Sequence, residues 1–317
     1  MALVKKRRDV VVTGVAGFIG SNLAERLCGE GFRVRGIDNL AYGLRSQIPR
    51  GVDFYKTDIR SKKCARLFSG IDTVFHLAAK NCIADCQADP VETADTNVTG
   101  TIKVLEACRA AKVRKLVYAE SSAVYEGSSR FPTPESRVAE KPVSFYACSK
   151  LAAGIFARRY CAYHRMRVTG LRYFNVYGPR QDYRRSIPPV MSAFIIALLK
   201  GRRPVIYGTG KRRRDFIYID DVNDFHLLAM RDSRTDGEVF NLGTGMAYSV
   251  KEIFELIRGL LGSTIKPCYR KSLPAEAEAT LADIRKAKSL GWSPRVPIEE
   301  GLRASIAYIR SIVLARL

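Results

Sequence analysis

Asp9-Val-Val-Val-Thr-Gly-Val-Ala-Gly-Phe-Ile-Gly20 joins a short apolar run directly to a glycine-rich turn. The residues that follow, Ser21-Asn-Leu-Ala-Glu-Arg-Leu27, have apolar side chains at helical spacing, so the segment predicts a buried strand, a tight turn and a helix. Glycines at 14, 17 and 20 allow the tight turn and the close approach of another molecule to the backbone. Because the amides at a helix N-terminus attract negative charge, this turn is typical of a pyrophosphate site.

A second predicted strand, Phe32-Arg-Val-Arg-Gly-Ile37, ends in Asp38. In dinucleotide-binding folds a carboxylate at this distance from the glycines binds the hydroxyls of the adenosine ribose. An acid at this position disfavours a 2′-phosphate, so the sequence predicts NAD rather than NADP.

The wider pattern alternates strands with helices as far as about residue 176. The predicted strands cover residues 10–13, 33–37, 52–55, 72–76, 114–119 and 167–174. This alternation predicts an α/β fold, a Rossmann-like doubly wound parallel sheet with a smaller C-terminal α/β substrate-binding lobe. We expect an NAD-binding domain at 1–176, with segments near 215–245 returning to it, and a mainly substrate-binding lobe at 177–317.

A phenol and an ammonium lie four residues apart in Tyr146-Ala-Cys-Ser-Lys150, which on a helix places them one turn apart on one face. A nearby cation favours the phenolate and lowers a tyrosine pKa toward neutrality, which suits proton transfer. Ser121 and Ser122 follow the strand at 114–119, at the sheet edge where such folds bind ligands. Each pattern alone is also compatible with an ordinary solvated helix face or a loop start.

Together these segments resemble the extended short-chain dehydrogenase/reductase superfamily and, within it, the NAD-dependent nucleotide-sugar 4-epimerases of the UDP-glucose and UDP-N-acetylglucosamine type. The resemblance covers nearly the whole chain. The matching segments are residues 14–20, 38–39, 58–59, 76–79, 97–101, 121–125, 146–150, 172–180, 214–221, 240–243 and 281–284.

The resemblance implies a mechanism. The Tyr146 phenolate, with Lys150 and Ser121, takes the proton of the sugar 4′-hydroxyl while NAD takes the hydride, and re-reduction on the opposite face gives the 4-epimer. The residues implied to bind the cofactor are Gly14, Gly17, Phe18, Ile19, Gly20, Asp38, Asn39, Asp58, Ile59, Leu77, Ala78, Ala79, Asn97, Tyr146, Lys150, Tyr173 and Phe174.

The same resemblance implies a substrate site. Its residues are Lys80, Cys82, Ser121, Ser122, Tyr146, Asn175, Val205, Tyr207, Arg214 and Thr280. Relatives that dehydrate or decarboxylate the sugar carry a glutamate where this chain has Ala123, so epimerisation is the remaining reaction. The favoured substrates are UDP-glucose and UDP-galactose. Thr280, at the position of a size-determining residue, also leaves room for the N-acetylated sugars.

Several positions depart from the family pattern. Leu273 replaces a second diphosphate arginine, and Ala275-Glu276 and Glu278 follow it. Glu120 occupies a position that is usually small. Glu126 replaces a glycine, and residues 80–82 replace a small polar loop. Lys80 and the positive charge keep UDP-glucuronate open as an alternative substrate, although Asn175 replaces the threonine expected in that subgroup.

A formal net charge of +22 includes basic clusters at 5–8, 184–185, 202–203 and 211–214, and most of the charge is expected on a solvated face. Such a field steers acidic ligands, either nucleotide sugars or nucleic acid. No stacking platform or zinc-finger spacing accompanies it, so a non-catalytic nucleic-acid-binding protein on this fold is the distant alternative. A one-way reductase that releases its cofactor is a nearer alternative.

The remaining expectations concern the setting of the protein. The N-terminus becomes polar before an apolar run forms, and the run at 190–199 is too short to span a bilayer, so we expect a cytoplasmic protein that does not bind membranes. Eight scattered cysteines are expected to be reduced, and Cys82 and Cys86 with His76 lack a fourth ligand, so no metal site is predicted. The family resemblance implies a homodimer through helices at 97–111 and 146–163.

Overall fold

A computed structural model describes residues 9–139, 141–185, 187–272 and 277–316. The basic cluster at 5–8 and the departures at Leu273 and Ala275-Glu276 lie outside these residues. In the described part of the chain, no helix has both the length and the apolar composition needed to cross a bilayer.

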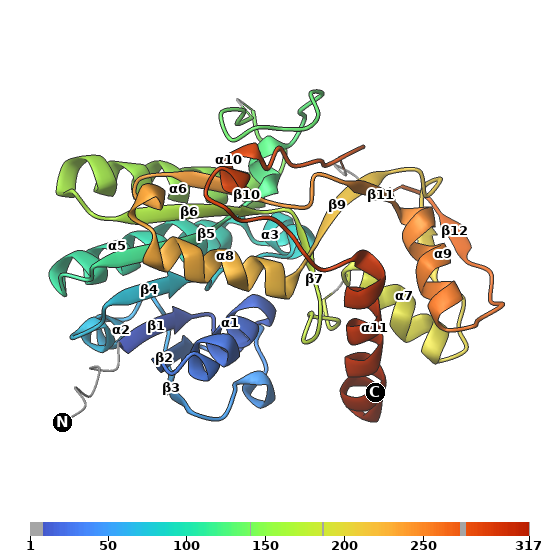
Figure 1. The fold of residues 1–317 in the computed structure, drawn as a ribbon, viewed down its shortest axis with the longest axis horizontal. Coiled ribbons are helices and arrows are strands. Elements are labelled where there is room, and N and C mark those ends of the chain that lie inside the picture. The colour runs from blue at the N-terminus through green and yellow to red at the C-terminus, as the bar shows by residue number, and fades with distance from the viewer. Residues whose placement is uncertain (1–8, 140, 186, 273–276, 317) are drawn as a thin grey trace.

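Seven parallel strands form the main sheet, in the order β10-β6-β5-β4-β1-β2-β3 (Figure 1). They are β1 (Asp9–Thr13), β2 (Arg33–Asp38), β3 (Val52–Lys56), β4 (Thr73–His76), β5 (Lys115–Ser121), β6 (Val168–Tyr173) and β10 (Val239–Leu242). The strand order reverses at β1, between β2 and β4. The predicted doubly wound sheet is therefore confirmed, and the carboxyl ends of β1 and β4 form the crevice where such folds bind ligands.

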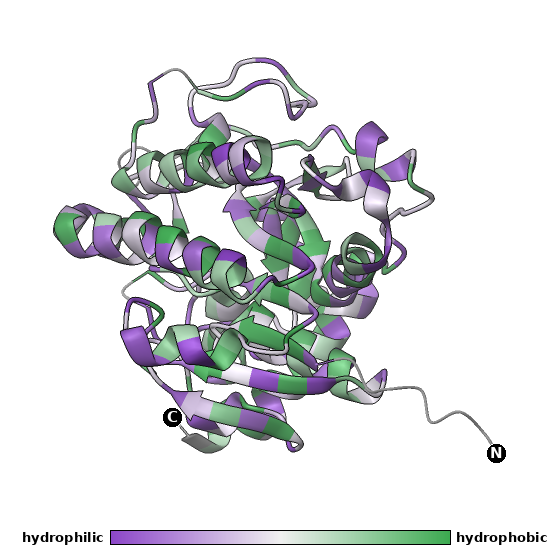
Figure 2. Cartoon of the chain, turned by 90° about the vertical axis from the view of Figure 1, so that its left-hand side faces the viewer, coloured by the Kyte–Doolittle hydropathy of each residue, from purple (hydrophilic) through white to green (hydrophobic). Residues whose placement is uncertain are grey.

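Helices cover both faces of this sheet because consecutive β1 side chains point to opposite sides. Val10 and Val12 pack in a core with α1 and α8, whereas Val11 packs in a second core with α2, α5 and α6. Figure 2 shows the hydrophobic residues concentrated in the central strands. The helices along this part of the chain are α1 (Phe18–Gly29), α2 (Lys62–Ala65), α3 (Ile83–Ala88), α4 (Pro90–Ala94), α5 (Gly100–Ala110), α6 (Phe145–His164) and α8 (Ile219–Arg231).

A smaller lobe lies beside the carboxyl ends of the strands (Figure 1). It contains a three-stranded sheet in the order β11-β9-β7 and a two-stranded parallel sheet of β12 and β8, with a separate core. Its elements are β7 (Asn175–Tyr177), α7 (Val190–Leu199), β8 (Val205–Tyr207), β9 (Arg213–Tyr218), β11 (Ala247–Ser249), α9 (Val250–Leu260), β12 (Cys268–Arg270) and α11 (Ile298–Tyr308), and α10 (Arg285–Lys288) lies against β10. The predicted smaller α/β lobe is confirmed.

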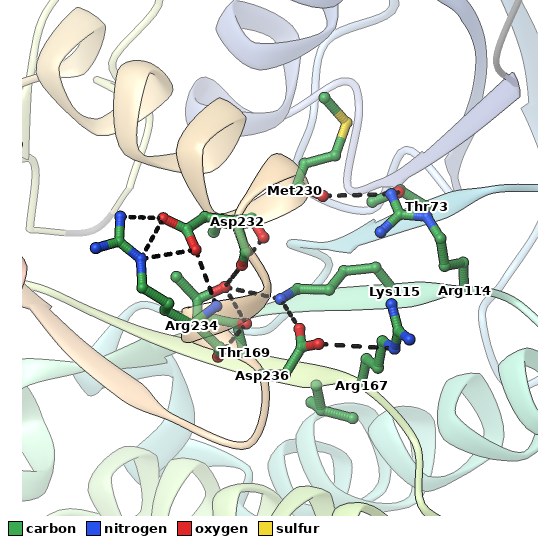
Figure 3. Close-up of polar contacts among 12 residues, drawn as sticks. Thr73, Arg114, Lys115, Arg167, Thr169, Met230, Asp232, Arg234 and Asp236 are labelled. Atoms are coloured by element: carbon green, nitrogen blue, oxygen red, sulfur yellow. Dashed lines mark hydrogen bonds and ion pairs between the residues drawn. The ribbon is translucent and has the colours of Figure 1, made fainter. Parts of the chain in front are cut away.

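Polar contacts fix the amino ends of β5 and β6 to the segment that leads from α8 to β10 (Figure 3). Lys115, at the start of β5, is buried and pairs with Asp236, and its ammonium donates a hydrogen bond to Thr235 Oγ1 at 2.7 Å. Arg167 lies 3.7 Å from the other Asp236 oxygen. This network lies at the end of the sheet opposite the crevice, so we assign it to stability.

Candidate active site

A cavity of about 1020 Å³ lies between the carboxyl ends of the main sheet and the smaller lobe. Its wall is formed by the β1–α1 turn, the ends of β2, β4, β5 and β6, residues 181–185, 187 and 189–191, and parts of β9 and residues 277–280. Of the predicted site residues, all but Asn97, Cys82, Val205 and Tyr207 line it.

The glycines of the β1–α1 turn lie very close to neighbouring backbone atoms. Gly14 has a φ of 73°, and a Cβ there would lie 2.8 Å from the Ala78 nitrogen. A Cβ on Gly20 would lie 2.1 Å from the Gly14 oxygen. The N-cap residue Gly17 has no capping side chain, so the first amides of α1 lack a side-chain acceptor there. An extended phosphate group therefore fits this end of α1.

Asp38 lies at the end of β2 with its carboxylate held in place. Its oxygens accept backbone hydrogen bonds from Ala16 at 3.0 Å and from Leu40 at 2.8 Å. Burial raises the pKa of Asp38, and these two hydrogen bonds oppose that effect. Each oxygen retains further acceptor capacity toward the cavity, which suits ribose hydroxyls.

Asp58 and Asn39 lie farther along the same wall and bind each other, with Asn39 Nδ2 donating to Asp58 at 2.9 Å. Arg60 also donates to both oxygens of Asp58 and lowers the pKa of Asp58 to about 2. This carboxylate is therefore ionised over the working range of pH.

Asn97 does not line the cavity. It is buried, its Oδ1 accepts from the Lys80 amide at 2.8 Å, and its Nδ2 donates to Lys80 O and Ser149 Oγ, each at 2.9 Å. Its side chain ties the loop after β4 to α6. Asn97 therefore supports that loop, and its contact with the cofactor stays a prediction.

The catalytic candidates converge between β5 and the start of α6. Ser121, the last residue of β5, lies near enough to the Tyr146 phenol to lower the pKa of Tyr146. Lys150, one turn after Tyr146, is buried and donates to Ala119 O at 3.0 Å. Glu126, one of the departures, accepts hydrogen bonds from the Val143 and Ser144 amides at the start of α6. The helix that carries Tyr146 is thus anchored beside β5.

Burial dominates the pKa of Tyr146 in this structure. It raises the pKa of Tyr146, while the nearby Ser121 hydroxyl and the Arg185 charge oppose that rise. Burial also lowers the pKa of Lys150 to about 8. Both residues lie in α6, four positions apart as predicted, but how strongly each group is desolvated depends on the packing of the helix and could not be predicted from the spacing.

Asn175 and Thr280 meet in the wall of the cavity. Asn175 Nδ2 donates to Asp215 O at 2.9 Å and to Thr280 Oγ1 at 3.2 Å, so two segments 105 residues apart form one surface. Arg214 lies on the adjacent strand β9, where it lines the cavity and donates to Arg213 O at 2.9 Å.

Four predicted substrate residues have different surroundings from those expected. Val205 and Tyr207 lie in β8, and Cys82 is buried before α3. Lys80 borders the cavity, but its ammonium donates to Asp89 O at 3.3 Å and lies 3.7 Å from the Asp89 carboxylate. Lys80 is therefore directed toward α4, which weakens the argument for a sugar carboxylate at this position.

Two loops that the sequence did not assign also border the cavity. The segment at 41–44 lies against the β1–α1 turn, where a Cβ on Gly43 would lie 2.6 Å from Ala16 Cβ. Arg184 donates a hydrogen bond to Tyr42 O, joining this segment to the loop before α7. The basic pair at 184–185 was the only signal for this contact.

The histidine and cysteines considered for a metal have other partners. His76 lies between Thr13 Oγ1, at 2.8 Å, and Thr101 Oγ1, at 3.1 Å, and burial lowers its pKa to about 3. Within the described ranges, no three His, Cys, Asp or Glu side chains are grouped as a metal site would require.

Residues 10–243 match the sequence profile of the NAD-dependent epimerase/dehydratase family. A putative UDP-glucose 4-epimerase of Methanocaldococcus jannaschii is 34% identical over 95% of this chain and 98% of its own. A UDP-glucuronate 4-epimerase of Thermodesulfobacterium geofontis is 35% identical over 93% of this chain and 94% of its own.

Solved structures agree in fold. A Thermotoga maritima UDP-glucose 4-epimerase with UDP-glucose superposes with a TM-score of 0.92 at 34% identity, covering 96% of this chain and 99% of that one. A Methanobrevibacter ruminantium UDP-N-acetylglucosamine 4-epimerase with UDP-N-acetylmuramic acid gives 0.92 at 30% identity, covering 98% and 100%. A Bacillus cereus UDP-glucuronic acid 4-epimerase with its substrate and NAD gives 0.88 at 30% identity, covering 96% and 99%.

Proposed function

This chain belongs to the NAD-dependent epimerase/dehydratase family, and we propose that it is an NAD-dependent 4-epimerase that interconverts UDP-glucose and UDP-galactose. The observation that carries the proposal is that Ser121, Tyr146 and buried Lys150 line the same cavity as the glycine turn between β1 and α1. One cavity therefore has groups for a dinucleotide at one end and for proton transfer at the other.

The residues fit NAD. The glycines at 14 and 20 let the β1–α1 turn pack against neighbouring backbone without a side chain, so its amides border the cavity, and Asp38 lines the same cavity as a ribose acceptor. When bound, NAD supplies the hydride acceptor and donor at C4′ and brings a positively charged nicotinamide ring. That charge opposes the effect of burial on the Tyr146 phenol.

We assign the protein groups the following roles in this reaction. Tyr146 removes the proton from the sugar 4′-hydroxyl and returns it after the sugar has turned. Ser121 holds that hydroxyl next to the phenol, and Lys150 holds the nicotinamide ribose. Ala123 offers no acid or base for dehydration or decarboxylation, so the reaction ends at epimerisation.

We assign the sugar end to Asn175 and Thr280, and the diphosphate to Arg214. Thr280 is small, so the pocket also admits the N-acetylated pair UDP-N-acetylglucosamine and UDP-N-acetylgalactosamine. UDP-glucuronate is the second candidate. Arg185 favours it because this guanidinium lines the cavity near enough to lower the pKa of Tyr146, although Asp182 already binds it at 3.3 Å.

The test is to incubate the purified protein without added cofactor with each UDP-sugar and to follow the anomeric protons by NMR. Conversion of UDP-glucose to a mixture of 4-epimers supports the proposal and retained NAD together. Turnover of UDP-glucuronate alone would reassign the substrate. A requirement for added NADH with one-way reduction would identify a reductase instead.

A Tyr146→Phe variant separates catalysis from binding. We expect turnover to fall by at least about a thousandfold because the phenol that moves the proton is missing, while retained NAD and the unfolding midpoint stay near wild type. Turnover close to wild type would remove Tyr146 from the mechanism. Salt-sensitive RNA binding without any sugar turnover would favour the nucleic-acid-binding alternative.

A further inference from the structure

Glu120 is a buried acid that directly precedes Ser121 in the chain. Its side chain is 2% exposed, and its Oε2 accepts from Arg172 Nε at 2.6 Å. The other oxygen, Oε1, accepts a hydrogen bond from the Tyr118 phenol and lies 3.6 Å from Arg158 Nη1. A carboxylate buried this deeply requires such partners.

The surrounding elements leave room for this carboxylate. A Cβ on Gly154 of α6 would lie 2.5 Å from Glu120 Oε1, and a Cβ on Gly170 of β6 would lie 2.9 Å from the Tyr118 hydroxyl. Strands β5 and β6 are adjacent in the sheet, and α6 packs on both (Figure 1). Two glycines on neighbouring elements therefore accommodate one pair of polar side chains.

The same carboxylate faces the catalytic stripe of α6. Lys150, Gly154 and Arg158 are spaced at i, i+4 and i+8, so they lie on one face of the helix. Glu120 meets this face at Gly154, between the two cations. Of the charges near Lys150, Glu120 does most to oppose the effect of burial on its pKa, with a smaller contribution from Cys86 of α3.

Burial disfavours the charged forms of the other titratable groups around Lys150. His76 of β4 has its pKa lowered to about 3 by burial and by Lys150 itself, so it is neutral at working pH. Burial raises the pKa of Tyr146 on α6 and of Cys86 on α3. Burial therefore disfavours the charged forms of Tyr146 and Cys86, so Glu120 is the main compensating charge that the described surroundings give to Lys150.

Arg172 extends the contact to the cavity wall. Its Nη1 donates to the Tyr125 hydroxyl at 2.8 Å and to Glu135 O at 2.7 Å. Tyr125 in turn donates to Asn241 Oδ1 at 2.7 Å, and its ring lies against Phe174. Tyr125 lines the cavity, so the Glu120–Arg172 pair also fixes a residue of the site.

We propose that Glu120 is a positioning residue of the epimerase site, whose carboxylate keeps Lys150 charged and, through Arg172, holds Tyr125 at the cavity wall. This inference rests on the proposed epimerase function. Glu120 does not touch the substrate in this scheme and acts through Lys150 and Tyr125. It also gives a physical reason for an acid at a position where related sequences usually have a small residue.

The first test is Glu120→Gln, which keeps the shape and removes the charge. Loss of a nearby negative charge makes the Lys150 ammonium easier to deprotonate, so we expect the alkaline limb of kcat against pH to move down by about one pH unit. At pH values above both midpoints this is about a tenfold loss of kcat. A uniform fall in kcat with an unmoved limb would overturn the proposal.

A second readout does not depend on turnover. The lysine Cε signals of the protein can be followed by ¹³C NMR during a pH titration, with Lys150→Met identifying the signal of Lys150. We expect its midpoint to be about one pH unit lower in Glu120→Gln. Equal midpoints would overturn the proposal even if no UDP-sugar were converted, whereas absent turnover in wild type would count against the epimerase function alone.

A relocated carboxylate provides the control if Glu120→Gln fails to fold. In an aspartate, the distance from Cβ to a carboxylate oxygen is about the same as the distance from a Cβ on Gly154 to Glu120 Oε1. The double variant Glu120→Ala with Gly154→Asp therefore places a carboxylate in the same space, carried by α6 instead of β5. We expect this double variant to restore the wild-type alkaline limb that Glu120→Ala alone shifts. A double variant that folds but keeps the shifted limb would overturn the proposal.

Discussion

Lys150 is assigned a catalytic role, and the burial of its ammonium also lowers the free energy of unfolding. Burial lowers its pKa from 10.5 to about 8, and each unit of such a difference corresponds to about 1.4 kcal/mol. Because the unfolded chain binds this proton more tightly, the cost is fully present below pH 8, and stability recovers as pH rises from about 8 to 10.5.

Lys150→Met should therefore stabilise the fold while abolishing activity. We expect the free energy of unfolding at pH 7 to rise by about 1–2 kcal/mol, since loss of the hydrogen bond to Ala119 O offsets part of the gain. The measurement is urea denaturation at pH 7 and pH 10. The difference from wild type should shrink at the higher pH, and a variant less stable than wild type at pH 7 would contradict the burial argument.

Thr280 is the residue at which sugar size can be tested. Thr280→Tyr fills the sugar end of the cavity, so we expect at least about a tenfold loss of kcat/KM for the N-acetylated pair with a smaller loss for UDP-glucose. Thr280→Val is the control, because it keeps the volume but removes the hydroxyl that accepts from Asn175. Equal losses for both sugar pairs in Thr280→Tyr would show that Thr280 does not set sugar size.

At the scale of elements, the Lys115 network makes a prediction about stability (Figure 3). Asp236→Ala leaves a buried ammonium without its acid, and we expect a loss of about 3 kcal/mol in the free energy of unfolding. Lys115→Met removes the buried charge itself, while Asp236 stays 23% exposed near Arg167, so we expect a change within about 1 kcal/mol. Denaturant unfolding measures the free energy of unfolding of both variants. An equal loss of stability in the two variants would contradict this prediction.

Helix α6 presents an apolar surface suited to the proposed homodimer. Ile155, Phe156 and Tyr163 are 50%, 42% and 83% exposed. In contrast, the apolar residues Val104, Leu105 and Cys108 of α5 pack in the protein's own core, so the dimer test below is made on α6. Exposed aromatic and aliphatic residues grouped on one helix are typical of an interface.

The paired change Ile155→Glu and Phe156→Glu should produce a monomer. Burying two carboxylates against a second copy is costly, so we expect sedimentation velocity to give a single species of half the wild-type mass. Met246→Glu is the control, because Met246 is 59% exposed on the smaller lobe. A wild-type protein that is already monomeric would reject the dimer.

Local patterns predicted the elements better than the contacts between them. The β1–α1 turn could be predicted because glycine spacing and apolar periodicity are properties of neighbouring residues. The pairing of Glu120 with Gly154 could not, because it depends on how α6 settles on β5. The same applies to the Arg184–Tyr42 contact, which joins residues 142 positions apart.

At the scale of the whole molecule, the cavity forms where two cores meet. The main sheet contributes the β1–α1 turn and the β5–α6 groups, and the smaller lobe contributes Arg214 on β9. Fold class and family could be predicted from sequence because they depend on many ordered local matches. The shape of the sugar pocket depends on how the lobe packs against the sheet, and so substrate choice did not follow from sequence.

The net charge of +22 makes a prediction about substrate capture. Arg184, Arg185 and Arg214 line the cavity, so the field of the molecule attracts an anionic UDP-sugar toward this opening. Salt screens that attraction over about 10 Å at 0.1 M. We expect kcat/KM to fall by about threefold to tenfold between low and about 0.3 M salt, with kcat unchanged, because screening affects the encounter and not the proton transfer.

Two variants test the origin of this salt dependence. Arg184→Ala should make kcat/KM less dependent on salt. Lys266→Ala should leave the dependence unchanged, because Lys266 is exposed and does not line the cavity. If kcat falls together with kcat/KM, salt acts on the site itself and the steering argument fails.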